Sequence, residues 1–144
     1  MKQPPGPSAA AIRRALLVWF GREARDLPWR RRRTPWRVWV SEVMLQQTRV
    51  EAVVEPYRRF LAGFPTMAAL AAASPSDVLA AWSGLGYYRR ARSLHEGARY
   101  VVRHHGGRLP RTRDELEKVP GIGPYTAGAL LSIAFGQREP AVDA

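Results

Sequence analysis

Glu42 is the side chain of this sequence whose surroundings could make it an acid catalyst. On a helical wheel drawn over residues 36–48, Trp39 lies on one side of Glu42, and Val38 and Leu45 lie on the other. Apolar surroundings disfavour a charged carboxylate and raise its pKa. A glutamic acid that stays partly protonated near neutral pH can act as a general acid. From the pattern alone, a solvated Glu42, or one paired with a nearby arginine, stays open as the simpler interpretation.

A glycine turn at residues 120–123 is the second feature that could bind a ligand. Glycine permits a positive φ and leaves no side chain between backbone N–H groups and a ligand. The N–H groups of Gly121 and Gly123 precede a predicted helix, whose dipole favours an anion such as phosphate. The alternative is an ordinary tight helix–helix turn. The basic context favours a phosphate site, and so do three apolar side chains expected to anchor the turn: Leu116, Val119 and Ile122.

The pattern Gly-apolar-Gly-x-Tyr occurs twice, at residues 84–88 and 121–125. Each copy lies between a predicted short helix and a longer one. Two copies are too few for a repeat protein. We expect two similar helix–turn–helix units that face one ligand.

Helices must position these residues, and helical periodicity runs through most of the chain. We find no strand pattern, so the predicted class is all-α. Residues 1–7 are expected to be a disordered lead-in, and residues 27–35 a loop bounded by two prolines. The predicted helices cover residues 8–24, 36–48, 50–62, 66–73, 76–82, 87–104, 112–118 and 124–135.

Composition narrows the possible functions. A chain of 144 residues with 46% hydrophobic residues is long enough for one globular domain. It has no cysteine, which excludes disulfides and thiolate metal sites within it, and no apolar run long enough to cross a membrane. The net charge of +11 indicates a polyanionic partner, nucleic acid before an acidic membrane, although an arginine-rich solvated surface is the alternative.

The three histidines, His95, His104 and His105, lack the spacing of a metal site. We expect surface or helix-end positions for them.

Four segments resemble, in the same order, the MutY-type adenine DNA glycosylases of the helix-hairpin-helix glycosylase superfamily: 27–30, 39–48, 82–92 and 119–129. The string Ser-Glu-Val-Met-Leu-Gln-Gln-Thr at residues 41–48 is specific to that family, whereas the hairpin alone indicates only the superfamily. The resemblance implies a six-helix barrel catalytic domain over residues 29–144, with the helix-hairpin-helix at 112–135. Residues 8–28 would then be the N-terminal helix that packs on a missing cluster domain.

The resemblance also implies a reaction, the hydrolytic excision of adenine mispaired with 8-oxoguanine or guanine, after the base has left the stack. Glu42 would protonate the adenine, Asp143 would stabilise or bond to the sugar cation, and Tyr125 would supply a hydroxyl beside them. DNA contacts are implied for Gly121, Gly123, Gln47, Thr48, Leu85, Tyr87, Trp29 and Arg30.

For the full-length protein the resemblance implies a 4Fe-4S cluster on four cysteines beyond this segment, followed by a domain that reads 8-oxoguanine. It implies a cytoplasmic, nucleoid-associated bacterial monomer whose partner is double-stranded DNA containing a mispaired adenine, with no membrane partner. Because that remainder is absent from a chain that ends at Ala144, we expect these residues to be poorly stable and weakly active when expressed alone.

Two other functions remain open. An endonuclease III-like glycosylase/lyase needs a lysine amine for a Schiff base with the sugar, and in that relative the lysine stands where this chain has Tyr125. A non-catalytic helix-hairpin-helix DNA-binding module would need neither Glu42 nor Asp143.

Overall fold

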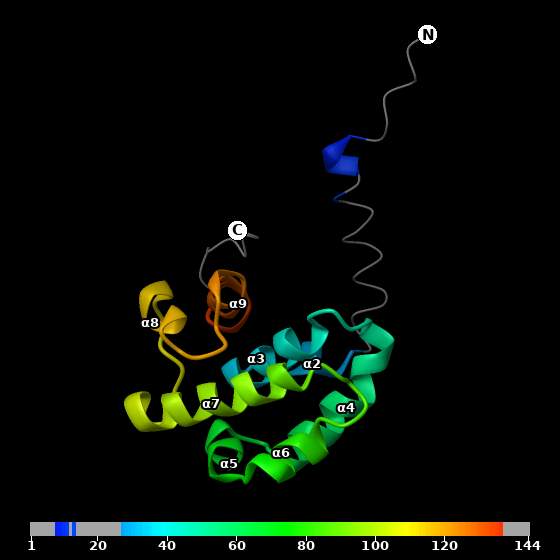
Figure 1. The fold of residues 1–144 in the computed structure, drawn as a ribbon. Coiled ribbons are helices and arrows are strands. Elements are labelled where there is room, and N and C mark those ends of the chain that lie inside the picture. The colour runs from blue at the N-terminus through cyan, green and yellow to red at the C-terminus, as the bar shows by residue number, and fades with distance from the viewer. Residues whose placement is uncertain (1–7, 12, 14–26, 137–144) are drawn as a thin grey trace.

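The computed structural model describes residues 8–11, 13 and 27–136, and every regular element in these ranges is helical (Figure 1). This confirms the predicted all-α class. The elements are α2 (Pro28–Arg31), α3 (Pro35–Leu45), α4 (Val50–Gly63), α5 (Met67–Ala72), α6 (Pro75–Ala81), α7 (Tyr88–His105), α8 (Arg113–Glu117), α9 (Pro124–Ala129) and a π-helical turn, η1 (Leu130–Ala134).

Hydroxyl caps fix where four of these helices begin. At the start of α3, α5, α6 and α8, a serine or threonine side chain accepts a hydrogen bond from the backbone N–H three residues later. Such a bond satisfies one of the N–H groups that the first helical turn leaves unpaired. The capping residues are Thr34, Thr66, Ser74 and Thr112.

Three local predictions differ from the structure. The helix predicted over residues 36–48 ends at Leu45, and Gln47, beyond that end, has φ 58°. The predicted loop over residues 27–35 contains α2, which begins at Pro28, because proline is well tolerated in the first turn of a helix. The single helix predicted over residues 124–135 changes from α9 to the wider η1. There, the Ser132 hydroxyl donates to the carbonyl of Gly128 at 2.9 Å, a bond that competes with the regular helical ladder.

The predicted N-terminal helix is described only at its start. Residues 9–11 and 13 are helical, and the Ser8 hydroxyl accepts a hydrogen bond from the Ala11 N–H at 3.1 Å. The remainder of the helix and the predicted lead-in at 1–7 lie outside the described residues.

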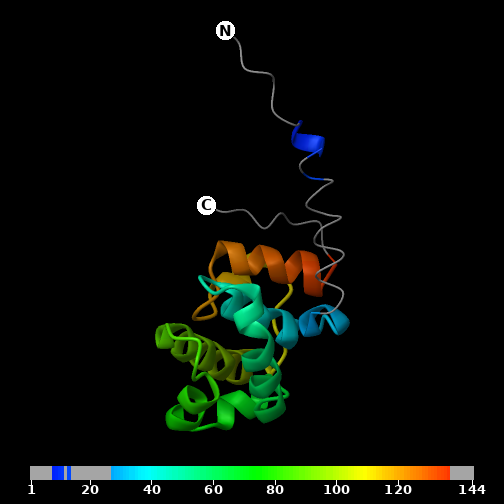
Figure 2. The same ribbon diagram turned by 90° about the vertical axis from the view of Figure 1, so that its right-hand side faces the viewer.

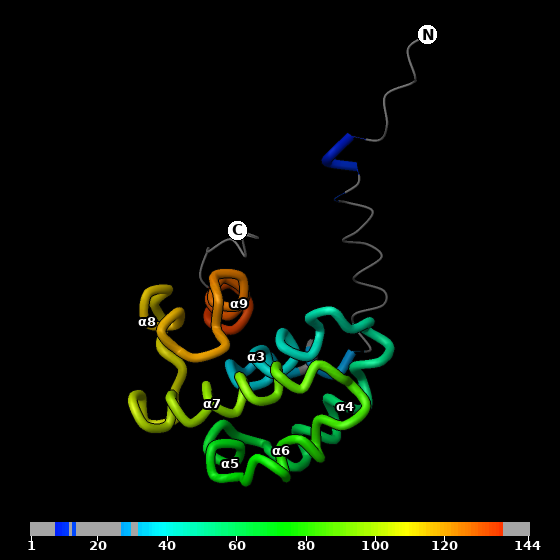
Figure 3. The backbone as a smooth tube through the Cα atoms, viewed as in Figure 1, coloured from blue at the N-terminus to red at the C-terminus, as the bar shows by residue number. Residues whose placement is uncertain are grey.

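The helices surround a core built on α3. This helix packs against α4, α7, α9 and η1, and its side chains Trp39, Val40 and Met44 are fully buried. Figures 1 and 2 show α7 between the α5–α6 pair on one side and the α8–α9 pair on the other. The tube in Figure 3 shows how the turn between α8 and α9 comes down onto α7. The long helix α7 therefore connects the two halves of the described part.

Gly97 allows that close approach. A Cβ at this position would lie 2.5 Å from the carbonyl oxygen of Pro120 and 2.7 Å from the Trp39 ring. Only glycine lets α7 press against both the α8–α9 turn and α3. The contact fixes where the turn lies relative to the helix that carries Glu42.

His95 corrects the expectation of a surface histidine. Its side chain is buried on the α5–α6 side of α7, and its Nε2 atom has no hydrogen-bond partner. Burial, and next the charge of Arg99, lower its pKa from 6.5. Burial thus disfavours the charged imidazolium at this position.

Among the described residues, no helix combines the length and the apolar character that crossing a bilayer requires.

Candidate active site and nucleic-acid interface

Glu42 lies in a small, mainly apolar hollow, which we call the Glu42 pocket. The pocket has a volume of about 170 Å³ and is lined by Trp29, Arg33, Val38, Ser41, Glu42, Leu45 and Ile133. Burial raises the pKa of the Glu42 carboxyl above its ordinary value of 4.5. The structure thus confirms the apolar surroundings and the direction of the pKa shift that the sequence predicted.

Helix α2 supplies one wall of this pocket. Its Trp29 side chain is only 7% exposed and stands edge-on to Tyr57 of α4, with 5.3 Å between ring centroids. An aromatic ring held in this way excludes water beside Glu42. Trp29, predicted as a DNA contact, is placed by the structure as a buried wall of the pocket.

A larger open groove, about 800 Å³ in volume, adjoins the pocket. Three segments line it: the end of α3, the start of α7 and the α8–α9 hairpin. Both Gly-apolar-Gly-x-Tyr segments contribute, so the two units do face one hollow, as the sequence predicted. The lining residues are Val43, Gln46, Gln47, Tyr87, Arg89, Arg90, Ser93, Leu94, Gly121 and Tyr125.

The hairpin turn is anchored on its core side and open on its solvent side. Its apolar residues Leu116, Val119 and Ile122 are buried in the core, as predicted. Gly121 has φ 84°, and a Cβ there would lie 3.1 Å from Ser93 of α7. Gly123 has no atom within 4 Å of its Cβ position, so its backbone is accessible from outside. The turn therefore presents glycine backbone next to the groove.

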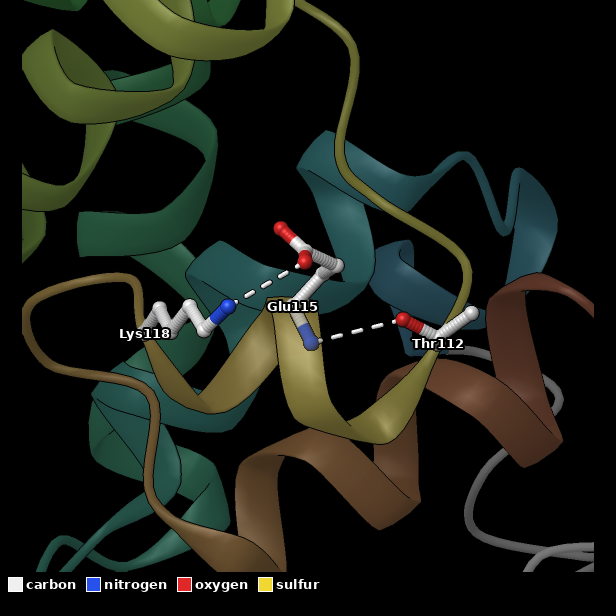
Figure 4. A network of polar contacts seen from close by, with 3 residues as sticks. All are labelled: Thr112, Glu115 and Lys118. Atoms are coloured by element: carbon white, nitrogen blue, oxygen red, sulfur yellow. Dashed lines mark hydrogen bonds and ion pairs between the residues drawn. The ribbon is translucent and has the colours of Figure 1, made fainter.

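Polar contacts hold α8 in place at the entry to this turn (Figure 4). The Thr112 hydroxyl accepts from the Glu115 N–H at 3.3 Å and so caps the start of α8. The Glu115 carboxylate lies 3.3 Å from Lys118 Nζ, so its side chain is engaged outward rather than toward Thr112. On the other side, Arg113 Nη1 donates to the carbonyl of Pro124 at 3.1 Å and joins the two helices.

Glu42 and Tyr125 lie in neighbouring hollows. Glu42 lines the pocket, whereas Val43 and Gln46, one and four residues further along, line the groove. Glu42 and Val43 are consecutive residues of α3, whose side chains point about 100° apart, so the two hollows occupy adjoining faces of this helix. Tyr125, 43% exposed, lines the groove and not the pocket. Asp143 lies outside the described residues.

The remaining predicted contact residues differ in accessibility. Gln47 and Tyr87 line the groove, with Tyr87 59% exposed, and Thr48 is half-buried. Leu85 is only 7% exposed and belongs to the hydrophobic core. Arg30 is part of α2, and its side chain lies outside what the structure describes.

Arg90 is a site residue that the sequence analysis missed. It lines the groove and donates hydrogen bonds to the end of α3 and to Thr48. These partners are more than 40 residues away in sequence, so local pattern carries no signal for the contact.

Comparison with known proteins identifies the family of the chain. The sequence model of the HhH-GPD superfamily of base excision DNA repair proteins matches residues 40–144. The chain belongs to this superfamily. The matched residues of this chain include Glu42, the groove-lining residues and the whole hairpin.

Relatives of the HhH-GPD chain include the adenine DNA glycosylases of Rattus norvegicus and Homo sapiens, 52% and 51% identical over 142 residues and 92% of this chain. The adenine DNA glycosylase of Mycobacterium tuberculosis is 44% identical over 96% of this chain. The chain spans 28%, 26% and 47% of the length of these three relatives.

Solved structures share the fold of the HhH-GPD chain. A thermostable thymine-DNA glycosylase superimposes with a TM-score of 0.79 at 31% identity, over 91% of this chain and 61% of its own. A non-covalent complex of endonuclease III with DNA superimposes with a TM-score of 0.73 at 26% identity, over 96% of this chain and 65% of its own.

The residues present do not fit a 4Fe-4S cluster. Such clusters are held mainly by cysteine thiolates, and this chain contains none. Within the described ranges, no group of three or more histidine, aspartate or glutamate side chains is placed to hold a metal ion.

Proposed function

We propose that this chain carries the catalytic part of an adenine DNA glycosylase. The observation that carries the proposal is Glu42, held in an apolar pocket beside an open groove that ends at the helix-hairpin-helix turn. A DNA-binding module has no use for a carboxyl whose pKa is raised by burial. The 44–52% identity to named adenine DNA glycosylases supports adenine as the base.

In the proposed reaction, protonated Glu42 gives its proton to N7 of an adenine that has left the duplex. The bond between the base and C1′ then breaks, and its electron pair leaves with the base. General acid catalysis of this kind supplies on the order of 10²–10⁴ in rate. The sugar is left as an oxocarbenium-like cation, which a nearby anion stabilises. We assign that role to Asp143, with ionised Glu42 then accepting a proton from the attacking water.

The groove is the proposed DNA interface. Backbone N–H groups of the turn at Gly121 and Gly123 would bind a phosphate, a contact that positions the strand without reading its sequence. Tyr87 is the proposed wedge, because an exposed aromatic ring can fill the gap that a displaced base leaves. Tyr125 would face the sugar from the same groove.

Recognition of 8-oxoguanine or guanine in the opposite strand is assigned to Gln47, Thr48 and Leu85. Because the Leu85 side chain is buried, a contact from this residue would come from its backbone. Arg30, following the pocket residue Trp29, would approach the target adenine.

The lyase alternative is less well supported. It needs a lysine amine at the sugar, and neither hollow of the described part is lined by lysine. Lys118 pairs with Glu115 at 3.3 Å, and neither residue lines the groove. We therefore propose base release without efficient strand cleavage.

For the full-length protein we propose a monomer that acts on double-stranded DNA in the nucleoid. Its domains would be the N-terminal helix over residues 8–28, the catalytic barrel over 29–144, and a 4Fe-4S domain whose ligands come from residues outside this chain.

The test incubates the full-length protein with duplexes that contain adenine opposite 8-oxoguanine, guanine or thymine. Chromatography of the free base is expected to show adenine from the first two duplexes and none from the third. Borohydride is expected to trap little covalent complex. Release of no adenine from any duplex would contradict the proposed function, and strong trapping would favour the lyase.

A further inference from the structure

Two turns of the described chain have unusual backbone geometry. Gln47 has φ 58° and Tyr87 has φ 50°, and they are the only non-glycine residues with positive φ in the described ranges. The left-handed region is unfavourable for side chains with a Cβ, and such residues persist only where the surroundings hold them. Both line the groove, although 40 positions separate them. The contacts that hold these two turns in the left-handed conformation therefore also shape the groove.

A single guanidinium reaches the first turn. Arg90 Nη1 donates to the carbonyls of Val43 at 2.9 Å and Met44 at 3.2 Å, and also to the carbonyl of Gln46. Arg90 Nη2 donates to the Thr48 hydroxyl at 3.0 Å. The cation thus caps carbonyls at the end of α3 and holds the residues on either side of Gln47.

The same guanidinium lies against the second turn. Its Cζ atom is 5.1 Å from the centroid of the Tyr87 ring and 5.6 Å from that of Trp82, distances at which a cation attracts an aromatic ring. Separately from the side chain, the backbone N–H of Arg90 donates to the Tyr87 carbonyl at 2.9 Å. Trp82 Nε1 in turn donates to the carbonyl of Gly86 at 3.0 Å, so the ring that the guanidinium contacts also binds the backbone of this turn.

These contacts leave Arg90 little capacity for DNA. Both terminal nitrogens are bonded to protein, Nε is buried, and the side chain is half-buried. The neighbouring Arg89 is exposed and lines the same groove. The contact with a phosphate is better suited to Arg89.

We propose that Arg90 is a positioning residue that locks the Gln47 turn and the Tyr87 turn into one preformed unit before DNA binds. The inference rests on the proposed function for the step that this unit serves, the displacement of adenine from the duplex. Preforming both turns removes the cost of ordering them on the DNA. A lysine cannot replace the arginine fully, because one ammonium group lacks the planar fork that reaches three carbonyls and a hydroxyl.

The first measurement is hydrogen–deuterium exchange of the free full-length protein, which needs no activity. The variants are Arg90→Lys, Arg90→Met and, as a control on the same helix, the exposed Arg92→Met. We expect faster exchange at residues 46–48 and 84–87 together in both Arg90 variants, and no change at either turn in the control. Unchanged exchange in Arg90→Lys, or a change at one turn only, would overturn the proposal.

The second measurement places 2-aminopurine at the target position, where its fluorescence rises when the base leaves the stack. Glu42→Gln is expected to keep the wild-type rise and lose base release. Arg90→Met is expected to lose most of the rise, with single-turnover adenine release lowered about tenfold or more, as for the loss of a hydrogen bond to a charged group. Arg90→Lys should be intermediate, and it decides the matter if Arg90→Met does not fold.

The two hypotheses fail separately. If the wild-type protein releases no adenine, the proposed function fails, while the exchange result still decides whether Arg90 couples the turns. If the wild-type protein releases adenine and a folded Arg90→Lys matches it in rate and in fluorescence, the positioning role fails and the proposed function stands.

Discussion

The chemistry proposed for this chain depends on the surroundings of one carboxyl. Glu42 belongs to a helix whose other residues are mostly buried, and the pocket around it is walled by Trp29, Val38 and Leu45. Burial in this pocket, which Arg33 and Ser41 also line, raises the pKa of the Glu42 carboxyl above its ordinary value of 4.5. The same residue in an exposed position would be ionised at neutral pH and would have no proton to give.

The direction of the pKa shift predicts how the rate depends on pH. Because burial raises the pKa of Glu42 above 4.5, the protonated form persists to higher pH than usual, and the rate should fall as pH rises through the shifted pKa. Single-turnover adenine release at saturating DNA, measured from about pH 5 to pH 9, checks this expectation. A rate that is constant or increasing over that range would rule out Glu42 as the acid.

Sequence reasoning at the residue scale succeeded where neighbours on one helix set the environment. The apolar flanks of Glu42 lie within four residues of it, so the helical wheel was sufficient. The DNA contact predicted for Trp29 stays a prediction. Helix α2, which was not predicted, places this ring in the wall of the Glu42 pocket. Arg90 was missed because its partners come from another helix, and only tertiary packing joins them.

At the scale of elements, α7 determines where the hairpin lies. Its Gly97 contacts the hairpin at Pro120 and the core at Trp39 simultaneously. The contact involves a backbone carbonyl and a fully buried ring, neither of which can move aside at low cost.

Gly97→Ala should therefore destabilise the protein and displace the hairpin. Overpacking of a filled site typically costs about 1–3 kcal/mol, so we expect a lower free energy of unfolding and weaker DNA binding. Urea denaturation and a binding titration measure the two effects. Gly63→Ala is the matched control, because a Cβ there meets nothing within 4 Å. If both variants unfold at the same urea concentration, α7 does not fix the hairpin in this way.

The packing of α5 and α6 on α7 should depend on pH through His95. Burial and then Arg99 lower its pKa from 6.5, while Glu96 and the carbonyls of Leu70 and Ala73 oppose the shift. The unfolded chain thus binds a proton more readily than the folded one. The contribution to stability is fully present above about pH 6.5 and is lost as pH falls below it.

Replacing His95 with glutamine should flatten this part of the stability profile. Thermal unfolding of wild type and His95→Gln, recorded from about pH 5 to pH 8, is the measurement. The exposed His104, replaced in the same way, serves as the control. Parallel profiles for wild type and His95→Gln would show that His95 titrates as it does in the unfolded chain.

The helices were predictable because their caps, glycines and apolar periods are local features. The starts at Thr34, Thr66 and Thr112 follow from hydroxyl caps. Helix α2 and the change to η1 were not predicted. Helix α2 has only four residues, too few to show the helical spacing of apolar side chains. The π-helical turn η1 does not change the spacing of apolar residues in the sequence, so no local signal distinguishes it from an α-helix.

At the scale of the whole molecule, the net charge of +11 and the proposed DNA interface in the groove predict an electrostatic contribution to binding. Binding should weaken steeply with salt, because each phosphate that is neutralised adds about 0.9 to the slope of log affinity against log salt. Replacing the exposed groove residue Arg89 with alanine should make that slope shallower by about one phosphate's share. Fluorescence anisotropy at several salt concentrations measures it. A slope that is flat, or one that Arg89→Ala leaves unchanged, would place the DNA elsewhere.

The central claim is that Glu42 releases the base, and one comparison tests it most directly. Single-turnover adenine release from a duplex with adenine opposite 8-oxoguanine is measured for the wild-type full-length protein, for Glu42→Gln and for the exposed control Glu51→Gln. We predict a loss of at least about 10²-fold for Glu42→Gln. Its melting temperature should not decrease, because glutamine removes a carboxylate that burial disfavours. Glu51→Gln should match wild type. Release at the wild-type rate by a folded Glu42→Gln protein would contradict the account.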